Sequence, residues 1–352
     1  MKSRTSRRSF LSTAAGAAVM ARLGHGAARS AQAAGDRPGP TAQDTFGLAE
    51  AGNKSPVIFD TDVGGDIDDT WALAMLLKSP ELDVKLVTSD SGNDTYRAKI
   101  LAKMLEVAGR TDVPVGIGCR PDDQKGRQSE WVGDYDLAGY PGKVHQDGVG
   151  AIIETIRASR DPITLLAIGP VPNVAEVLRR APDVAKRARF VGMHGSVHRG
   201  YGGSEKISPE YNVRAAPEAL EAVFAAPWEV SITPLDTCGI VHLEGEKYQK
   251  VFRCKDPVVQ ALMANYRAWC AAAGGKGVPD PAKRSSTLFD TVAVYMAFSE
   301  KLLGMETVPL RVTDDGFTKI DPSARPVRCA TQWKDLPAFE DELVARLTSA
   351  KA

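Results

Sequence analysis

The sequence predicts a single α/β domain with a Rossmann-like core, in which a mostly parallel, open sheet is flanked by helices. Short apolar runs alternate with helical patterns from about residue 55 to residue 232, which is typical of βαβ units. Hydrophobic residues make up 43% of the 352-residue chain, which is ample for a packed core. We therefore expect one globular domain over residues 55–352.

The expected elements follow one another in the order that such a sheet requires. An apolar strand at 57–59 is followed by a helix at 69–77, a strand at 84–88 and a helix at 97–108. The alternation continues at 113–117, in a helix near 150–158, and at 163–167, 171–178, 190–191, 217–225 and 230–232. In open sheets of this kind, ligands bind beyond the carboxyl ends of the strands. The acidic run after the strand at 57–59 and the segment Ile168-Gly169-Pro170 after the strand at 163–167 are therefore expected on one face.

Residues 1–33 are expected to be an export signal. Arg7 and Arg8 precede an alanine-rich apolar stretch, and Ala31-Gln32-Ala33 offers the small residues that a signal peptidase needs. The arrangement resembles a twin-arginine signal, which implies a periplasmic or extracellular protein. Residues 34–54 are rich in Gly, Pro, Ala and Thr without periodicity, which predicts a flexible leader.

Removal of the expected signal changes the charge balance. The full chain has 44 basic and 44 acidic residues, and the signal holds six of the basic residues and none of the acidic ones. The remainder, with 38 basic and 44 acidic residues, is mildly acidic, which argues against a nucleic acid partner because phosphate binding needs a basic face. The sequence contains no stretch of eighteen apolar residues, so no membrane span is expected.

The cysteines do not form a metal-binding or disulfide pattern. There are five, an odd number, and no CxxC pair occurs. We therefore expect neither a zinc cluster nor a dense disulfide scaffold, and buried free thiols are the default for most of them. The five residues are Cys119, Cys238, Cys254, Cys270 and Cys329.

Five aspartates follow the first expected strand within ten residues: Asp60, Asp62, Asp66, Asp68 and Asp69. Carboxylates this close repel one another and would destabilise the fold unless a cation or protons neutralise them. Oxygen donors beside flexible glycines suit Ca²⁺ or Mg²⁺ rather than zinc. The simpler alternative, in which Asp68 or Asp69 only caps the following helix, explains one or two of the five acids. The sequence therefore predicts a metal-dependent hydrolase with its metal site at this strand end.

The acidic loop is one of several segments whose order and spacing resemble the inosine-uridine-preferring nucleoside hydrolase family. Its sequence, DTDVGGDIDD at residues 60–69, matches the DTDxG and DD signature of that family. The other matching segments are ITLLAIGPVPNVA at 163–175, VGMHGS at 191–196, EYNV at 210–213 with PEA at 217–219, and FDTVA at 289–293. The resemblance covers most of residues 55–352 and implies a nucleoside hydrolase-like catalytic domain. It also implies a small-molecule nucleoside substrate and a role in purine or pyrimidine salvage.

The resemblance implies a calcium-dependent enzyme that hydrolyses the N-glycosidic bond of a ribonucleoside to free base and ribose. Asp62, Asp69 and Asp290 would provide carboxylate ligands to Ca²⁺, and Ile168 would provide its backbone carbonyl. Asp62 would also accept a proton from the attacking water, since a C–N glycosidic bond that breaks through an oxocarbenium-like sugar needs an activated water.

The resemblance also implies the residues that hold the sugar. Asp68, Asn93, Glu210 and Asn212 would bind the ribose hydroxyls, and Met193 would lie against the sugar ring. The acidic loop is two residues longer than the shortest family version, so Asp66 competes with Asp68 for one ribose role. We favour Asp68 because the DD pair directly opens the helix, and we expect Asp60 to support the loop from behind.

Two departures concern the leaving base. Phe289 stands where many family members have a histidine that protonates a purine, and phenylalanine cannot donate a proton. His194 and His198 flank Met193 and are the nearest alternative donors, although each is more often a surface or hydrogen-bonded histidine. Tyr201 falls near a position where better-known members carry an asparagine for the sugar. The sequence therefore does not specify which nucleobase is released. It also does not specify whether the protein forms a homo-oligomer.

Two other functions are compatible with parts of the sequence. A haloacid dehalogenase-type phosphohydrolase also has a strand that ends in DxD, with the first Asp as a covalent nucleophile. That alternative needs a Ser or Thr after a later strand, where this chain has Ile168-Gly169-Pro170. The second alternative is an exported protein that binds a nucleoside or sugar but has no catalytic activity. Phe289 is compatible with it, because phenylalanine cannot donate a proton to a leaving base.

Overall fold

The computed structural model describes residues 54–90, 94–119, 126–275 and 277–349. Ten strands form one sheet, in the order β4-β3-β2-β1-β5-β6-β7-β10-β8-β9. Their bounds are Ser55–Thr61 (β1), Leu82–Ser89 (β2), Val115–Gly116 (β3), Val144–His145 (β4), Ile163–Ala167 (β5), Ala188–Met193 (β6), Val230–Thr233 (β7), Leu303–Val312 (β8), Thr318–Ile320 (β9) and Pro326–Trp333 (β10). The predicted α/β fold with a mostly parallel open sheet is confirmed.

The parallel part of the sheet is centred on β1, which lies between β2 and β5. Val57 of β1 is paired with Val84 of β2 on one side and with Thr164 of β5 on the other. All neighbouring pairs from β4 to β10 are parallel, whereas β8 is antiparallel to both β10 and β9. Strands that are covered on both faces read as continuous apolar runs, which is why the sequence pattern revealed β1 and β5.

Helices lie between the strands in the chain and cover the sheet. Their bounds are Asp68–Leu77 (α1), Asp94–Val107 (α2), Ser129–Val132 (α3), Gly148–Ala158 (α4), Pro172–Arg180 (α5), Tyr211–Ala215 (α6), Pro217–Ala225 (α7), Leu235–Cys238 (α8), Gly245–Arg253 (α9), Pro257–Ala273 (α10), Phe289–Met296 (α11) and Leu336–Thr348 (α12). Short 3-10 helices occur at Leu137–Gly139 (η2), Pro182–Lys186 (η3) and Tyr201–Gly203 (η4).

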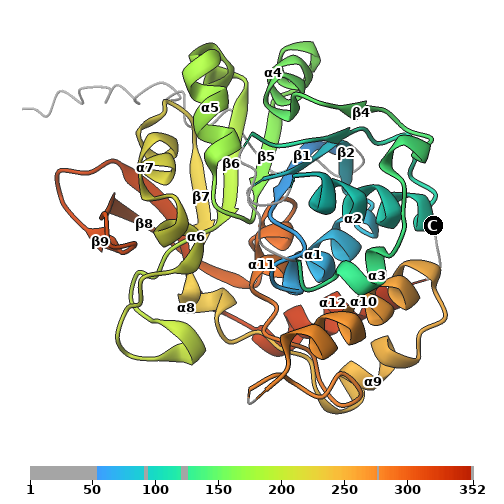
Figure 1. The fold of residues 1–352 in the computed structure, drawn as a ribbon. Helices are drawn as coiled ribbons and strands as arrows, with labels where there is room; N and C mark the ends of the chain where they lie inside the picture. Colours follow the sequence, from blue (N-terminus) through green and yellow to red (C-terminus); the bar gives the residue numbers. More distant parts are fainter. Residues whose placement is uncertain (1–53, 91–93, 120–125, 276, 350–352) are drawn as a thin grey trace, which may run out of the picture. The chain divides into compact units, whose positions relative to one another are not determined.

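Two hydrophobic clusters cover the two faces of the sheet. Alternate side chains of a strand point to opposite faces, so Val57 and Phe59 belong to one cluster and Ile58 to the other. The first cluster contains buried residues of α1, α2, α10, α11 and α12, and the second contains those of α4, α5 and α7. Figure 1 shows these helices as two groups on either side of the strands.

Helix α1 is almost completely buried, which fixes the acidic loop that precedes it. Nine of its ten residues are buried, including Asp68 and Asp69 in the first turn. The Trp71 ring lies 6.4 Å from Tyr248 and 6.1 Å from Tyr266, measured between centroids. These rings come from α9 and α10, so helices from the second half of the chain hold the first turn of α1 in place.

The strands and helices expected from the sequence pattern end at residue 232. Among those that the pattern did not predict are α9, α10, α12 and the strands β8, β9 and β10. In β8, the buried residues Val308, Leu310 and Val312 alternate with less buried ones. This period of two is the signal of an antiparallel strand with one covered face, and it is weaker than the apolar runs of the parallel strands.

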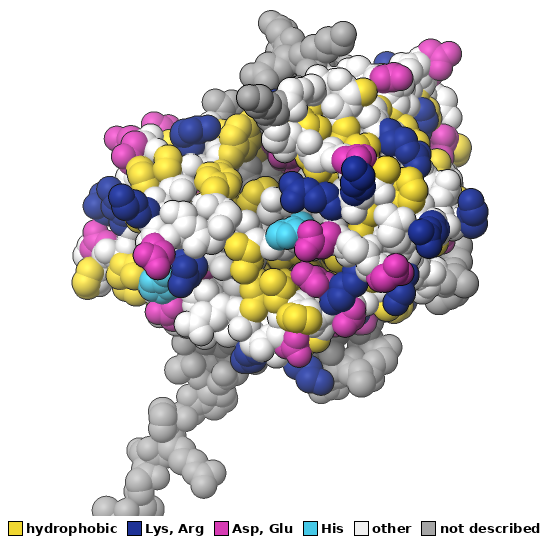
Figure 2. Space-filling model, turned by 90° about the horizontal axis from the view of Figure 1, so that it is seen from below, with side chains coloured by type: hydrophobic (Ala, Val, Ile, Leu, Met, Phe, Trp, Pro, Cys, Tyr) yellow, Lys and Arg dark blue, Asp and Glu magenta, His cyan; other side chains and the backbone are white. Residues whose placement is uncertain are grey.

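Other expectations concern the termini, the surface and the thiols. The expected signal, residues 1–33, lies outside the described residues, as does the leader up to residue 53. In the described part of the chain, no helix is long and apolar enough to cross a bilayer. All five cysteines are free thiols, but only Cys238 and Cys329 are buried, so the expectation that most of them are buried is wrong. On the face in Figure 2, basic side chains alternate with acidic and hydrophobic ones, so its described residues form no continuous basic patch.

Candidate active site

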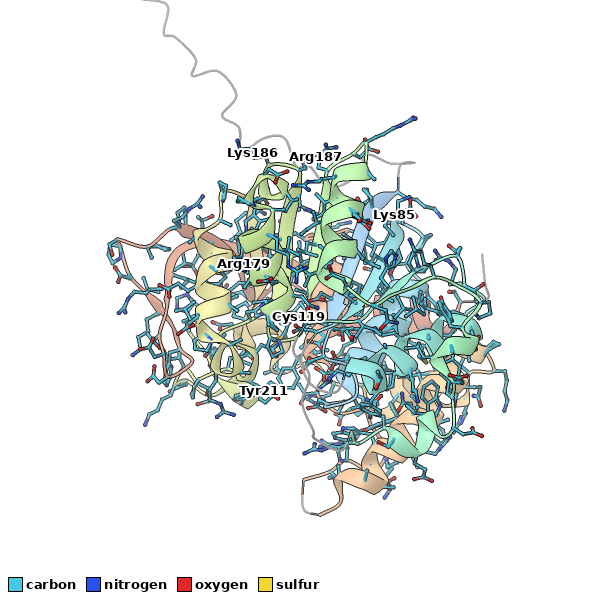
Figure 3. The ribbon with its side chains drawn as sticks, turned by 45° about the horizontal axis from the view of Figure 1, so that its top comes forward. Lys85, Cys119, Arg179, Lys186, Arg187 and Tyr211 are labelled. Atoms are coloured by element: carbon cyan, nitrogen blue, oxygen red, sulfur yellow. The ribbon has the colours of Figure 1, made fainter. Side chains whose placement is uncertain are left out.

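A cavity of about 400 Å³ lies beyond the carboxyl ends of β1, β5 and β6. Asp62, Ile168 and Met193, which end or directly follow these three strands, all line it. In Figure 3, Lys186 and Arg187, which precede β6, lie at the top of the view, and Tyr211, another lining residue, lies well below them. The predicted convergence of the strand ends on one face is therefore observed, as expected for an open α/β sheet.

Three carboxyl groups form a compact cluster at the wall of this cavity. Oxygen atoms of Asp68, Asp69 and Asp290 all lie within 4.8 Å of one another, and the three residues are buried. Asp68 and Asp69 begin α1, and Asp290 lies in the first turn of α11, where helix amide groups favour negative charge. Burial, followed by the neighbouring carboxylates, raises the pKa of all three groups well above the usual range.

The chemistry of this cluster fits a divalent cation. Every donor is a carboxyl oxygen, and the Asp68 and Asp290 carboxyl groups are close enough to share a proton. A hard cation would replace that proton and remove the repulsion. The three carboxylates could therefore hold a metal ion.

Asp62 adjoins the cluster rather than belonging to it. Its carboxyl group is within hydrogen-bonding reach of Asp69, and burial raises its pKa while the nearby Arg97 guanidinium lowers it. A side chain at Gly169 would place its Cβ 2.6 Å from Asp62 Oδ1, so the glycine lets the β5 end approach this carboxylate closely. The family resemblance implies that Asp62 binds the metal and Asp68 binds the sugar, whereas the structure groups Asp68 more tightly with Asp69 and Asp290.

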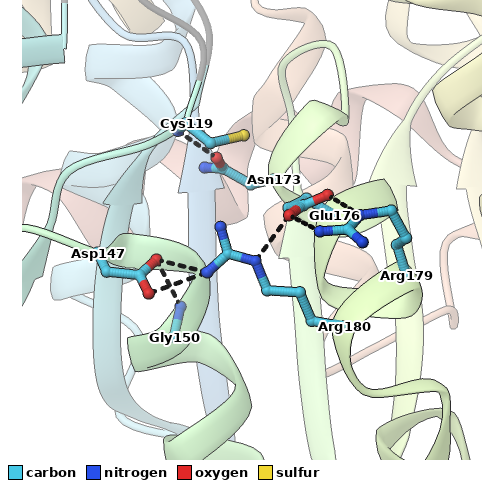
Figure 4. A network of polar contacts seen from close by, with 7 residues as sticks. All are labelled: Cys119, Asp147, Gly150, Asn173, Glu176, Arg179 and Arg180. Atoms are coloured by element: carbon cyan, nitrogen blue, oxygen red, sulfur yellow. Dashed lines mark hydrogen bonds and ion pairs between the residues drawn. The ribbon is translucent and has the colours of Figure 1, made fainter.

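Asp60 lies behind the loop. Its Oδ1 accepts hydrogen bonds from Thr88 Oγ1 and from Asn173 Nδ2, the latter at 2.8 Å. Asn173 in turn accepts the backbone N–H of Cys119 at 3.0 Å, a contact drawn in Figure 4 beside the surface ion pairs of Arg180. Burial raises the pKa of Asp60 to about 6. The asparagine thus ties β1 to the loop that follows β3.

Asp66 is exposed, and the loop around it is held through its backbone. Its Oδ1 accepts the N–H of Ile67 at 2.7 Å. The fully buried Gln128 donates from Nε2 to the Asp66 carbonyl at 2.9 Å and accepts a bond from Asn265 Nδ2 at 2.9 Å. Trp269 Nε1 donates to the Gly65 carbonyl at 3.1 Å. A lone glutamine far from the loop carries no sequence signal, so Gln128 was not foreseen.

The sugar-binding candidates from β6 and α6 lie together. Asn212 Nδ2 donates to the carbonyl of Ile168 at 2.8 Å and to that of Met193 at 3.1 Å. Glu210 caps α6, with its oxygens 2.8 Å from Asn212 N and 3.1 Å from Gly195 N. Glu210 and Asn212 are buried and line the cavity. Burial raises the pKa of Glu210 to about 7. The remaining candidate, Asn93, lies outside the described residues.

Aromatic rings form another part of the cavity. Phe289 and Tyr201 meet edge to face, with ring centroids 6.0 Å apart and an interplanar angle of 84°. The Tyr201 hydroxyl accepts the backbone N–H of Tyr211 at 2.9 Å. All three residues line the cavity, so the structure brings the sequence-predicted Tyr201 and Phe289 together.

The two histidine candidates do not line the cavity. His194 is fully buried, its Nε2 is 3.0 Å from the Gly169 carbonyl, and burial lowers its pKa to about 4. It directly follows Met193 at the end of β6, so the two neighbouring side chains point to opposite sides, and its ring lies 5.7 Å from Phe190. His198 Nε2 is 2.9 Å from Glu306 Oε2, at the surface.

Two arginines line the cavity without having been foreseen. Arg97 donates from a guanidinium nitrogen to the Val63 carbonyl at 2.8 Å, and Arg127 donates its backbone N–H to the Gly64 carbonyl at 3.1 Å. Both contacts are to the acidic loop. Single arginines on a helix and in a loop usually indicate a solvated surface, which is why only the folded arrangement reveals them.

Comparison with known proteins decides what kind of site this is. The sequence profile described as "Inosine-uridine preferring nucleoside hydrolase" matches residues 57–339. The chain belongs to this family. It is an N-glycosyl hydrolase, and the haloacid dehalogenase-type alternative is wrong.

Individual proteins that are similar to this chain are also named as nucleoside hydrolases or nucleosidases. Pyrimidine-specific ribonucleoside hydrolase RihA of Citrobacter koseri is 33% identical over 220 residues, which are 59% of this chain and 69% of the relative. Probable uridine nucleosidase 2 of Arabidopsis thaliana is 27% identical over 309 residues, 82% of this chain and 92% of the relative. A solved plant nucleoside hydrolase, PpNRh1, has a TM-score of 0.72 at 22% identity, over 84% of this chain and 99% of that one. The solved structure shares the fold.

The raised pKa of Glu210 gives this nucleoside hydrolase a testable pH dependence. A carboxyl group whose pKa rises from its ordinary value of 4.5 to about 7 on folding binds its proton more tightly in the folded state. Its contribution to stability is therefore present below pH 4.5 and is lost as the pH rises to about 7. Between these limits, metal-free wild type should lose about 3 kcal/mol more stability than Glu210→Gln, measured by urea unfolding. Parallel pH profiles of the two proteins would contradict this expectation.

Proposed function

We propose that this nucleoside hydrolase is a calcium-dependent ribonucleoside hydrolase that releases free base and ribose. The observation that carries the proposal is the buried cluster of Asp68, Asp69 and Asp290 at the wall of a cavity of nucleoside size. Its donors are all oxygen atoms, which favours Ca²⁺ or Mg²⁺ over zinc. The family resemblance of the acidic loop favours calcium.

Calcium would be held by the carboxylates of Asp62, Asp69 and Asp290 together with the backbone carbonyl of Ile168. Asp62 and Asp69 are neighbours, and the Ile168 carbonyl already faces the Asn212 amide. When bound, the ion supplies positive charge that orients two sugar hydroxyls and makes a water molecule more acidic.

The side chains of this protein would carry out the remaining tasks. Asp62 accepts the proton of the attacking water, for which its place beside the cluster is suited. Asp68, Glu210 and Asn212 accept and donate hydrogen bonds to the ribose hydroxyls, together with Asn93. Met193, whose sulfur is 3.5 Å from Asn212 Nδ2, lies against the sugar ring. Relatives whose names specify pyrimidine ribonucleosides and uridine support a nucleoside substrate for the same site.

Removal of the metal or of Asp62 tests this assignment directly. Treatment with a chelator should abolish ribose release from inosine and uridine, and added calcium should restore it. Asp62→Ala should lower kcat by about 100-fold or more, because it removes the general base. Reducing-sugar formation is the measurement, and Asp134→Ala, an exposed carboxyl outside the cavity, is the control. Full activity of metal-free protein would overturn the proposal.

The roles of Asp66 and Asp68 can be separated by a pair of variants. Asp68 is buried in the carboxyl cluster, whereas Asp66 is exposed and bonds to the loop backbone. We expect Asp68→Ala to raise KM by about tenfold or more through loss of a charged hydrogen bond, and Asp66→Ala to have a smaller effect. Steady-state kinetics at saturating calcium measure both. A harmless Asp68→Ala would refute the assignment of the sugar contact.

We also propose export by the twin-arginine route to the periplasm or the exterior. The arginine pair, the apolar segment and the Ala31-Gln32-Ala33 sequence support it. Protein recovered outside the cytoplasm should begin at Ala34, as read by N-terminal sequencing. Lysines at both Arg7 and Arg8 should retain the protein inside the cell, whereas Arg22→Lys should not. An exported protein that keeps Met1 would contradict the proposal.

A further inference from the structure

Three aromatic rings line the cavity next to the carboxyl cluster. Phe289 directly precedes Asp290 at the start of α11, and Tyr201 meets it edge to face at 6.0 Å. Tyr211 is joined to Tyr201 by the 2.9 Å hydrogen bond from its backbone N–H. Tyr201 is 43% exposed and Tyr211 is 53% exposed, so much of both side chains is accessible to a ligand. A flat heterocycle attached to a sugar beside the carboxyl cluster would meet these rings.

The described lining offers this heterocycle no histidine as a proton donor. A neutral nucleoside loses its base as an anion unless an acid protonates it. Among the described lining residues there is no histidine, lysine or cysteine, and Phe289 has no proton to give. Burial raises the pKa of Tyr201 to about 12, which makes it a weak acid. Both oxygens of Glu210 already accept backbone N–H groups, from Asn212 and Gly195.

The charges of the cavity favour a cation. The described lining contains six carboxyl groups and two guanidinium groups. The carboxyl groups outnumber the guanidinium groups by four. Arg97 and Arg127 contact the acidic loop, whereas the rings come from η4, α6 and α11. A positively charged ring beside the partly exposed side chains of Tyr201 and Tyr211 would gain cation–π attraction as well as attraction to this acidic lining.

We propose that the preferred substrates are N-ribosides whose base is positively charged at the glycosidic nitrogen, such as an N-ribosylpyridinium. The proposal rests on the ribonucleoside hydrolase function above and specifies its substrate class. Phe289, Tyr201 and Tyr211 are then the residues that determine specificity.

The chemistry of such a substrate needs no leaving-group acid. The oxygen of water forms the new bond to the anomeric carbon, and the electron pair of the broken C–N bond returns to the ring nitrogen. The base leaves as a neutral molecule. The proton of the water is accepted by Asp62 and released to solvent, so the products are ribose, neutral base and one proton. With a neutral nucleoside, that proton would have to reach the base.

The test compares four substrates with the calcium-loaded wild-type protein. The N-riboside of carbamoylpyridinium is the cationic probe, and inosine and uridine are the neutral nucleosides. p-Nitrophenyl riboside is the neutral reference whose leaving group needs no acid. We expect kcat/KM of inosine and uridine to be about 100-fold below that of the pyridinium riboside, the scale of a missing general acid. Binding of N-methyl carbamoylpyridinium should also be tighter than that of neutral nicotinamide, measured by calorimetry.

Variants separate charge recognition from the missing acid. Tyr211→Leu and Tyr201→Leu should raise KM for the pyridinium riboside more than KM for p-nitrophenyl riboside. Tyr135→Leu, a tyrosine outside the cavity, should leave that ratio unchanged. Phe289→His, which introduces a proton donor, should raise kcat/KM of inosine relative to p-nitrophenyl riboside.

The outcomes distinguish this inference from the proposed function. If inosine or uridine is hydrolysed as efficiently as the pyridinium riboside, the substrate class is wrong and the nucleoside hydrolase function stands. The substrate class is also wrong if N-methyl carbamoylpyridinium binds no more tightly than nicotinamide. It is wrong as well if the tyrosine variants raise KM equally for the pyridinium riboside and for p-nitrophenyl riboside. If none of the four ribosides releases ribose, the proposed function itself is overturned.

Discussion

The mutual repulsion of buried carboxylates is the constraint on which this active site depends. Asp68, Asp69 and Asp290 are held within 4.8 Å of one another by two helix N-termini, and Asp62 adjoins them. Such an arrangement is unfavourable in a fold that does not bind a cation or retain protons, because burial penalises every one of these charges. The surrounding structure therefore has to impose the geometry. It does so by burying α1 and by fixing the loop backbone through Gln128 and Trp269.

Local patterns predicted the parallel half of the fold and the acidic end of the site. The strands β1, β2 and β5 and the helix α1 appear in the sequence as continuous apolar runs or periodic segments, because both sides of each are covered. Only the family resemblance predicted that Asp290 lies beside Asp69, because the residues around Asp290 contain no signal of that contact. The strands after residue 300 have one exposed face and a weaker pattern.

The residues that sequence reasoning missed or misplaced share a physical cause. Gln128 and Arg97 act through contacts with a loop from which they are distant in sequence, and a single polar residue has no periodicity to reveal it. His194 was considered because it adjoins Met193. At a strand end, however, adjacent side chains point to opposite sides. Because Met193 points into the cavity, His194 points away from it.

The positions of the clustered carboxyl groups in the sequence also determine when during synthesis a cation could bind to all of them. Its members come from the start of α1 and the start of α11, which are separated by most of the sheet. A growing chain that has reached only α10 therefore has two of the three carboxylates and lacks the third. A cation held by all three carboxylates would therefore stabilise the completed fold and would find only part of its site in the partly synthesised chain.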